Sequence, residues 1–282
     1  MMVPVAVLAL AMLLVTPRLP TAVQVWLAPG LVPGGLLGPD RSDLVLRPEP
    51  ASLPVPVRSG ADAPTPGFEA QDGRLRPAAG PAATGEPHAF LATQQLSGAT
   101  VPVAWSPCRP VHVVLDPAGA PADAEGQLLA ALGALSEATG LAFAYDGTTD
   151  ERPDPDRTAF QPERYGDRWA PVLVAFDDDV RHDGRDVAGL TEVRSVSVDG
   201  GPQVRVSGQV RLSRRTMSYP AAGGAPGWVP VLRHELGHLV GLAHVDDPRE
   251  LMYPGVGLAA TYAAGDLVGL AALGSGPCAP QT

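Results

Sequence analysis

Three histidines and a glutamate lie close together near the end of the sequence, in a pattern that could hold a metal ion. The segment HELGHLVGLAH spans residues 234–244 and contains three of the six histidines in the chain. On a helix, His234 and His238 are one turn apart and share a face, so both imidazoles can reach one ion. Gly241 allows the backbone to leave the helix in a left-handed turn, which brings His244 back as a third nitrogen ligand.

Glu235 adds the chemistry of hydrolysis to this metal site. Three imidazoles suit zinc, and three protein ligands leave the fourth position for water, as in catalytic rather than structural sites. Glu235 points to a neighbouring helix face, where a carboxylate can accept a proton from that water and pass it to a leaving amine. Zinc lowers the pKa of such a water to about 7. A zinc ion that only holds the fold would have little need of Glu235 and usually has four protein ligands.

The segments around this motif predict a mixed α/β sheet domain that positions it. Apolar residues at helical spacing predict a helix over Pro121–Thr139, which Gly140 ends. Two further helices are predicted around Val229–Val240, which carries the first two histidines, and around Tyr262–Leu273. Runs of β-branched and alternating residues predict strands at Arg109–Asp116, Leu141–Tyr145, Pro171–Phe176 and, twice, within Val187–Leu212.

Composition and charge exclude several classes of function. The chain has 282 residues and lacks Lys, Asn and Ile, so no lysine can form a Schiff base and no N-glycosylation sequon exists. Its 20 arginines face 30 acidic residues, for a net charge of −10. An acidic chain without a basic run argues against nucleic acid as a partner. The 45% of hydrophobic residues is enough for one good core.

Proline density and hydropathy divide the chain into three regions. Residues 1–37 begin with the apolar run MMVPVAVLALAMLLV, which suits a secretory signal peptide or a membrane anchor. Residues 38–100 are rich in Pro, Gly and Ala and predict a linker or pro-segment, in which His88 is solvated. Residues 101–282 predict one folded domain. We therefore expect a protein that is secreted or tethered at the extracellular face by its N-terminus; the alternative is a disordered apolar tail in the cytoplasm.

The two cysteines bracket the predicted domain. Cys108 precedes its first strand, and Cys278 lies four residues from the end of the sequence. In an exported protein this placement predicts a disulfide that ties the two ends of the domain together. The alternative is a pair of free thiols, including a thiolate that caps the metal.

A loop rich in carboxylates offers a second place for a cation. Between Asp146 and Asp186 there are 12 acidic residues in 41, and five of them lie close together from Asp177 onward. Oxygen ligands at this density could hold Ca²⁺. The alternative is a solvated loop opposed by its six arginines. His182 could join a second metal site there or be a lone surface residue.

Together with a methionine that follows it, the histidine motif resembles the signature of the metzincin metallopeptidases, which is HExxHxxGxxH and a methionine turn. Met252 lies eight residues after His244 and is followed by Tyr253 and Pro254. The chain is most similar to the matrixin branch, as in bacterial secreted matrixin-like peptidases. The stretches that carry this similarity are DPRELMYP at 247–254 and GDLVGLAALG at 265–274.

The resemblance implies a fold and a set of roles. The fold would be a metzincin-like α/β (α+β) domain, with a mixed, mostly parallel twisted sheet, an active-site helix and a C-terminal helix. His234, His238 and His244 would bind one Zn²⁺, and Glu235 would be the general base. Met252 would form a hydrophobic floor under the metal, in a turn completed by the tyrosine and proline after it.

The resemblance also implies a function and a mode of substrate binding. The chain would be a monomeric zinc-dependent endopeptidase that cleaves peptide bonds of extracellular proteins. An extended peptide would lie antiparallel to an edge strand formed by Val204–Leu212. Gly255–Thr261 would line an apolar pocket for the side chain that follows the cleaved bond. The alternatives are hydrolysis of a non-protein amide, and an exported binding module without activity whose zinc is structural.

Overall fold

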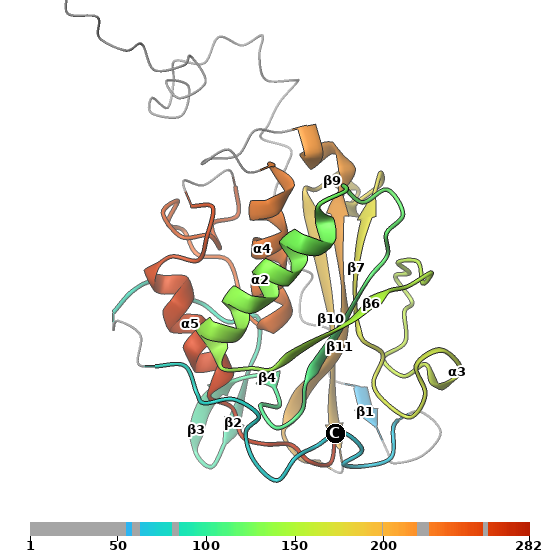
Figure 1. Ribbon diagram of the computed structural model, residues 1–282. Coiled ribbons are helices and arrows are strands. Elements are labelled where there is room, and N and C mark those ends of the chain that lie inside the picture. The colour runs from blue at the N-terminus through green and yellow to red at the C-terminus, as the bar shows by residue number, and fades with distance from the viewer. Residues whose placement is uncertain (1–54, 58–62, 81–84, 199, 219–225, 256–258) are drawn as a thin grey trace, which may run out of the picture. The chain divides into compact units, whose positions relative to one another are not determined.

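The computed structural model describes residues 55–57, 63–80, 85–198, 200–218, 226–255 and 259–282. Within these residues the chain forms a mixed α/β domain with a mostly parallel central sheet (Figure 1). The predicted signal or anchor over residues 1–37 lies outside them. No helix in the described part of the chain is both long enough and apolar enough to cross a membrane.

The strands of the central sheet, as far as the structure describes the chain, are β1 (Val55–Val57), β4 (Ala104–Trp105), β5 (Val111–Leu115), β6 (Phe143–Thr148), β7 (Val172–Asp177), β10 (Gly189–Val198) and β11 (Gln203–Ser213). Their order is β1-β10-β11-β7-β5-β6, with β4 beside β11. Strands β4, β5, β6, β7 and β11 run parallel to one another, whereas β10 runs antiparallel to β11. β1 pairs in parallel with the last three residues of β10.

Strand β11 corrects one prediction from the sequence. Val204–Leu212 was expected at an edge, but β11 pairs with β10 on one side and with β7 and β4 on the other, so the prediction of an edge strand is wrong. The polar residues that alternate along β11 are buried because they have partners. Arg205 Nε donates to the Val103 carbonyl at 3.0 Å, and Ser207 Oγ donates to the Ala170 carbonyl at 2.7 Å. Polar and apolar residues alternate along β11 because its polar side chains are buried with hydrogen-bond partners, and not because one face of the strand lies in solvent.

The three predicted helices all form, within a few residues of their predicted ends. They are α2 (Ala124–Thr139), α4 (Trp228–Val240) and α5 (Ala264–Gly274). Gly140 ends α2 at a φ of 71°, with its N–H donating to the Ser136 carbonyl at 2.8 Å. The remaining described elements are short: β2 (Thr93–Leu96), β3 (Ala99–Pro102), α3 (Pro162–Tyr165), β8 (Arg181–His182), β9 (Arg185–Asp186) and the 3₁₀ helix η2 (Arg214–Ser218).

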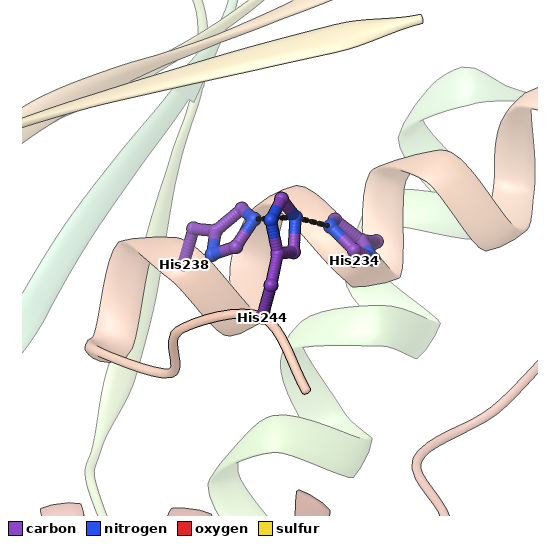
Figure 2. A group of neighbouring side chains, drawn as sticks. All are labelled: His234, His238 and His244. Atoms are coloured by element: carbon purple, nitrogen blue, oxygen red, sulfur yellow. Dashed lines mark hydrogen bonds between the residues drawn. The ribbon is translucent and has the colours of Figure 1, made fainter. Parts of the chain in front are cut away.

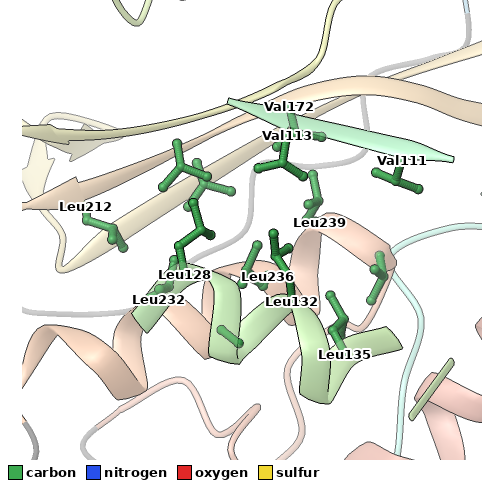
Figure 3. Packing of buried hydrophobic residues seen from close by; sticks show 14 of the residues in the cluster. Val111, Val113, Leu128, Leu132, Leu135, Val172, Leu212, Leu232, Leu236 and Leu239 are labelled. Atoms are coloured by element: carbon green, nitrogen blue, oxygen red, sulfur yellow. The ribbon is translucent and has the colours of Figure 1, made fainter. Parts of the chain in front are cut away.

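The hydrophobic core lies between the sheet and helices α2 and α4, which pack on the same face of it (Figure 3). Strand β7 is buried up to Phe176, as its continuous apolar run predicts. Each of the two helices contributes a row of leucines at helical spacing, and each fully buried leucine stabilises the fold by roughly 1.5–3 kcal/mol. The rows are Leu128, Leu132 and Leu135 of α2, and Leu232, Leu236 and Leu239 of α4. This packing fixes the helix that carries the first two histidines.

Parts of the predicted linker contact the domain. The Gln71 N–H donates to the Cys108 carbonyl at 2.8 Å. Further along the chain, strands β2 and β3 form an antiparallel hairpin, and the Val103 N–H after it donates to the Ala92 carbonyl at 2.9 Å. These described residues of the predicted linker are therefore hydrogen-bonded to the sheet domain.

Cys108 and Cys278 lie at the distance of a disulfide, with their Cα atoms 5.3 Å apart. The pair joins the segment before β5 to the segment after α5, across 170 residues of sequence. The predicted pairing of the two ends of the domain is thus the one that the structure contains, and neither cysteine is a free thiol.

Candidate metal centre

Helix α4 and the turn after it bring the three predicted ligands together. His234 and His238 lie on α4 and are 1% and 0% exposed. The helix ends at Gly241, whose φ of 131° is one that residues with a Cβ atom avoid. The Gly241 N–H donates to the Gly237 carbonyl at 3.1 Å. The chain then turns back, so that the His244 ring lies between the other two (Figure 2).

The Nε2 atoms of the three histidines converge (Figure 2). His244 Nε2 lies 3.0 Å from His234 Nε2 and 3.1 Å from His238 Nε2. A tetrahedral zinc ion with Zn–N bonds of about 2.0–2.1 Å needs its nitrogens about 3.3 Å apart, so small shifts of the rings would accommodate it. Among the described residues, no fourth His, Cys, Asp or Glu belongs to this group. The buried triad could therefore bind a metal ion.

Two backbone carbonyls decide which ring nitrogen each helical histidine presents. His234 Nδ1 donates to the Leu251 carbonyl at 2.7 Å, and His238 Nδ1 donates to the Leu242 carbonyl at 2.8 Å. A carbonyl oxygen can only accept, so the proton is on Nδ1 and the lone pair is on Nε2. Hydrogen bonds of this kind orient the ring and raise its basicity as a ligand.

Burial keeps these imidazoles neutral. It lowers the pKa of His234 to about 4, against the raising effect of the hydrogen bond with the Leu251 carbonyl. Burial, together with the charges of His234 and His244, lowers the pKa of His238 well below its usual value. Neutral imidazole is the form that binds a metal, so these two rings are ready to do so at neutral pH.

Glu235 lies against strand β10 and is 1% exposed. Its Oε2 accepts a hydrogen bond of 2.7 Å from the Thr191 hydroxyl. A Cβ atom at Gly189 would come within 2.6 Å of Oε1, so this glycine makes room for the carboxylate. Burial raises the pKa of Glu235 to about 8, against the lowering effect of the Thr191 hydrogen bond. The helix with two candidate ligands thus also carries a buried group that can accept and release a proton near neutral pH.

Met252 packs against the same helix. It is 1% exposed, and a Cβ atom at Gly237 would come within 2.6 Å of its sulfur, so this glycine allows the close approach. The Met252 carbonyl accepts a hydrogen bond of 3.1 Å from the Val245 N–H, which links the methionine turn to the residue after the third ligand. Tyr253 and Pro254 follow in the turn and are half-buried.

Helix α5 holds this turn through Asp266. The Asp266 carboxylate accepts hydrogen bonds from the N–H groups of Leu251 at 2.7 Å, Met252 at 3.3 Å and Ala263 at 2.9 Å. Burial and the nearby Glu250 raise the pKa of Asp266 to about 6, although the three N–H donors lower it. The carboxylate therefore ties the start of α5 to the segment that accepts the His234 hydrogen bond.

Sequence reasoning misses three residues of this centre, Thr191, Gly189 and Asp266. The first two lie on a strand more than 40 residues before the histidine motif, and nothing in the local pattern connects them to it. Asp266 is the third residue of the observed α5, where an acidic side chain can cap the first turn, but the predicted helix start at Tyr262 hides this position.

The predicted pocket wall, Gly255–Thr261, is described only in part, because residues 256–258 lie outside the described residues. Its far end is tied to α4. An Arg233 Nη atom donates to the Ala260 carbonyl at 2.8 Å, and the Tyr262 hydroxyl donates to the Arg233 carbonyl at 2.6 Å. The two bonds fix the end of the wall to the residue that precedes the first ligand.

The acidic loop is neutralised by arginines of the chain. Asp177 lies 2.9 Å from Arg211, and Asp179 lies 2.6 Å from Arg181. Further ion pairs join Asp178 to Arg214 and Asp186 to Arg215. Apart from the histidine triad, the described residues contain no other group of three or more His, Cys, Asp or Glu side chains with converging ligand atoms. The arginines that pair with the loop come from the loop itself, from β11 and from η2. A calcium ion in this loop stays a prediction.

His182 and His88 take no part in the described metal group. His182 lies 3.5 Å from the Asp183 carboxylate, next to it in sequence. His88 is exposed, as predicted, and its Nδ1 donates to the Glu86 carbonyl at 2.9 Å.

The centre can now be compared with known proteins. No protein-family model matches the chain, and no curated protein matches it. The possible chemistry of the site is therefore inferred from its three histidines and Glu235 alone. Three imidazoles whose Nε2 atoms converge can hold a metal of the zinc type. The buried Glu235 beside them can move a proton, and this combination supports metal-assisted hydrolysis.

Proposed function

We propose that the protein is a zinc-dependent endopeptidase of the metzincin type, similar to the matrixin branch. The observation that carries this proposal is the convergence of three Nε2 atoms, two of them from buried histidines of the helix that also carries the buried Glu235. The fold supports it, because a mostly parallel sheet, a helix with two ligands and a closing helix are what the metzincin resemblance implies.

Each residue of the centre has a role in this proposal. His234, His238 and His244 would hold one zinc ion and leave its fourth position for water or a carbonyl oxygen. When bound, zinc would lower the pKa of that water and polarise the scissile carbonyl. Glu235 takes the proton of the attacking water and gives it to the leaving nitrogen. Thr191 holds Oε2, which leaves Oε1 as the atom that takes the proton.

Strand β10 is the place where a peptide substrate would lie. β1 covers only Val196–Val198 of this strand, and no strand among the described residues pairs with Gly189–Thr191 on the side away from β11. An extended peptide can add to such a strand through main-chain hydrogen bonds. Because Gly189 lies against Glu235, a peptide added there would have one of its bonds beside the general base. We therefore propose Gly189–Thr191 of β10 as the substrate-binding strand, instead of the edge strand predicted at Val204–Leu212.

The compartment belongs to the same proposal. The enzyme would be secreted, or held at the extracellular face by its N-terminal segment. The cysteine pair agrees with this, because disulfides persist in oxidising compartments. A purely structural zinc is less well supported, because such sites usually have four protein ligands and the described group has three.

The test is a digest of a proteome-derived peptide library by the full chain with added zinc, with and without a chelator. We expect hydrolysis that the chelator abolishes and that zinc restores. Glu235→Gln should lower the rate by at least about a hundredfold, because it removes the proton acceptor. The zinc content of Glu235→Gln, measured by elemental mass spectrometry, should equal that of the unaltered chain. The exposed Glu163→Gln is the matched control and should keep full activity.

Two results would contradict the proposal. Turnover retained in Glu235→Gln would remove this residue as the general base. Tight zinc binding without hydrolysis of any library peptide would favour a structural zinc in a binding module.

A further inference from the structure

The chain upstream of the predicted domain runs along the turn that carries His244. This segment, Pro87–Leu91, falls within the region predicted as a linker or pro-segment. We propose that it is a positioning element of the metal site, which holds the turn of the third ligand in place. The proposal rests on the zinc site proposed above, and its test is read out on metal binding as well as on activity.

The first support is a short antiparallel pairing between this segment and the turn. The Leu91 N–H donates to the Gly241 carbonyl at 2.9 Å, and the Ala243 N–H donates to the Ala89 carbonyl at 2.8 Å. Between these two bonds, residue 90 faces residue 242 in an isolated antiparallel bridge. Ala243 directly precedes His244, so the pairing ends one residue before the ligand.

The second support is a face of α5 without side chains. Gly265 and Gly269 are four residues apart and therefore lie on the same face of the helix. A Cβ atom at Gly265 would overlap the Pro87 carbonyl oxygen, and one at Gly269 would come within 3.3 Å of the His88 Cβ. The helix is thus shaped to receive the start of the segment.

The segment is also anchored beyond the turn. Phe90 packs against the main hydrophobic core, and its ring centre lies 5.5 Å from that of His88. Ala92 directly follows the segment, and its carbonyl accepts a hydrogen bond of 2.9 Å from the Val103 N–H. This bond ties the end of the segment to the chain that enters the sheet. The contact with the turn is therefore held from both sides.

The backbone on both sides of His244 is held by hydrogen bonds. His234 and His238 sit within α4 and are held further by their Nδ1 hydrogen bonds. His244 lies beyond the helix, in a stretch without regular structure, and is half-buried. Its two neighbours each donate a backbone hydrogen bond, Val245 to the methionine turn and Ala243 to the upstream segment. The second of these hydrogen bonds comes from the proposed positioning element.

One consequence concerns maturation. If a pro-segment is removed from this chain, a cut that leaves an active enzyme has to fall upstream of Pro87. A cut at the predicted domain boundary near residue 101 would release the positioning element and loosen the turn of the third ligand.

Four variants of the full chain test the proposal. Leu91→Pro removes the N–H that bonds to Gly241, whereas Leu91→Ala keeps it. Ala92→Pro is a matched control, because the Ala92 N–H donates no backbone hydrogen bond to another described residue. Gly265→Ala displaces Pro87 although alanine favours a helix more than glycine does.

The readouts are zinc affinity, from competition with a chromophoric chelator, and the visible spectrum of the cobalt(II) form, which reports ligand geometry. Removing a group that orients a ligand typically weakens metal binding about 10–100-fold. We expect a loss of that size and an altered cobalt spectrum in Leu91→Pro and Gly265→Ala, and neither change in the two controls. Circular dichroism and thermal unfolding of the metal-free proteins separate this effect from a general loss of stability, which would leave the cobalt spectrum unchanged.

The outcomes are distinguishable. If the unaltered chain binds no zinc, the proposed function fails and this inference fails with it. If the unaltered chain binds zinc and Leu91→Pro and Gly265→Ala bind it equally well with the same cobalt spectrum, only this inference is overturned. If Leu91→Pro does not fold, Gly265→Ala decides, because unchanged zinc affinity in that variant also overturns the inference.

Discussion

The hydrogen bond between Thr191 and Glu235 sets the direction in which the proposed general base points. The carboxylate is buried, and the hydroxyl holds Oε2 at 2.7 Å. Hydrogen bonds to charged groups contribute about 1.5–3 kcal/mol, and a buried carboxylate without its donor loses this amount. The hydroxyl also fixes the carboxylate against β10, where we propose that the substrate binds.

Thr191→Val removes this donor at nearly constant volume. We expect kcat/KM for peptide hydrolysis to fall about 10–100-fold, the rate equivalent of the lost hydrogen bond, while the zinc content stays unchanged. Thr191→Ser keeps the hydroxyl and should retain most of the activity. Steady-state kinetics of the three proteins check this. Equal kcat/KM for Thr191→Val and the unaltered chain would show that Thr191 does not position Glu235.

At the scale of residues, the sequence predicts the site residues that are related by their spacing along the chain. His234, His238 and Gly241 follow from the helical period and the need for a left-handed turn, and the structure brings His244 to them as expected. Thr191 could not be predicted in this way, because its contact with Glu235 spans 44 residues and joins a strand to a helix. Such contacts depend on the packing of elements and leave no periodic trace in the sequence.

At the scale of elements, a cluster of charges fastens the segment before β2 to the sheet. His112 of β5 lies between two carboxylates, with Nδ1 2.9 Å from Asp146 and Nε2 3.3 Å from Glu69. Arg168 lies 2.9 Å from Asp146 and 3.8 Å from Glu69. Burial lowers the pKa of His112, but the two carboxylates outweigh it and raise this pKa above 6.5. Burial raises the pKa of Glu69, but His112 and the nearby arginines outweigh it and bring this pKa below 4.5.

These shifts predict how the stability of the cluster depends on pH. The contribution of His112 is fully present below pH 6.5 and is lost as the pH rises through its raised pKa. The contribution of Glu69 is fully present above pH 4.5 and is lost as the pH falls through its lowered pKa. We therefore expect the cluster to stabilise the protein most between these two values.

The measurement is the free energy of unfolding from denaturant titrations of the unaltered chain and of His112→Gln. The difference between the two should be largest below pH 6.5 and should shrink as the pH rises through the raised pKa of His112, because the histidine then loses its charge. Gln95→Ala, at an exposed residue that does not titrate, is the control, and its difference from the unaltered chain should not depend on pH. A difference that stays constant over the range would mean that the charge of His112 does not stabilise the protein.

The helices show what the sequence predicts well, and β11 and the upstream segments show what it does not. Helical periodicity and Gly140 placed α2 within three residues of its observed start. The alternation along β11 was misinterpreted, because Arg205 and Ser207 are buried with partners that the sequence does not show. Several described contacts before residue 101, such as those of Glu69, Gln71 and Leu91, are single backbone hydrogen bonds or charge pairs, which have no period to detect.

At the scale of the whole molecule, the cysteine pair closes the domain. Cys108 and Cys278 are 170 residues apart in sequence, so their bond restricts most of the unfolded chain. Loop-closure entropy for a loop of this length corresponds to about 5 kcal/mol. The closed loop contains the central strands, both core helices and the metal centre.

Replacing both cysteines by serine should therefore lower the free energy of unfolding by up to about 5 kcal/mol, mainly because the unfolded chain gains freedom. Urea titrations of the double variant and of the unaltered chain measure this difference. Intact mass under non-reducing conditions provides the control, because the disulfide makes the unaltered chain two hydrogens lighter than its reduced form. Two free thiols in the unaltered chain, or equal unfolding free energies, would contradict the prediction.

The counter-ions of the acidic loop are arginine side chains of the same chain, so dilution cannot remove them. Asp177 and Asp179 are balanced by Arg211 and Arg181, which are part of the same chain. Salt screens such surface pairs, whereas a chelator has nothing to remove from them. A chelating agent would therefore act at the three histidines and leave this loop intact. The ion pairs of this loop would respond to the ionic strength of the medium, whereas a metal ion held by the three histidines would respond to the supply of metal.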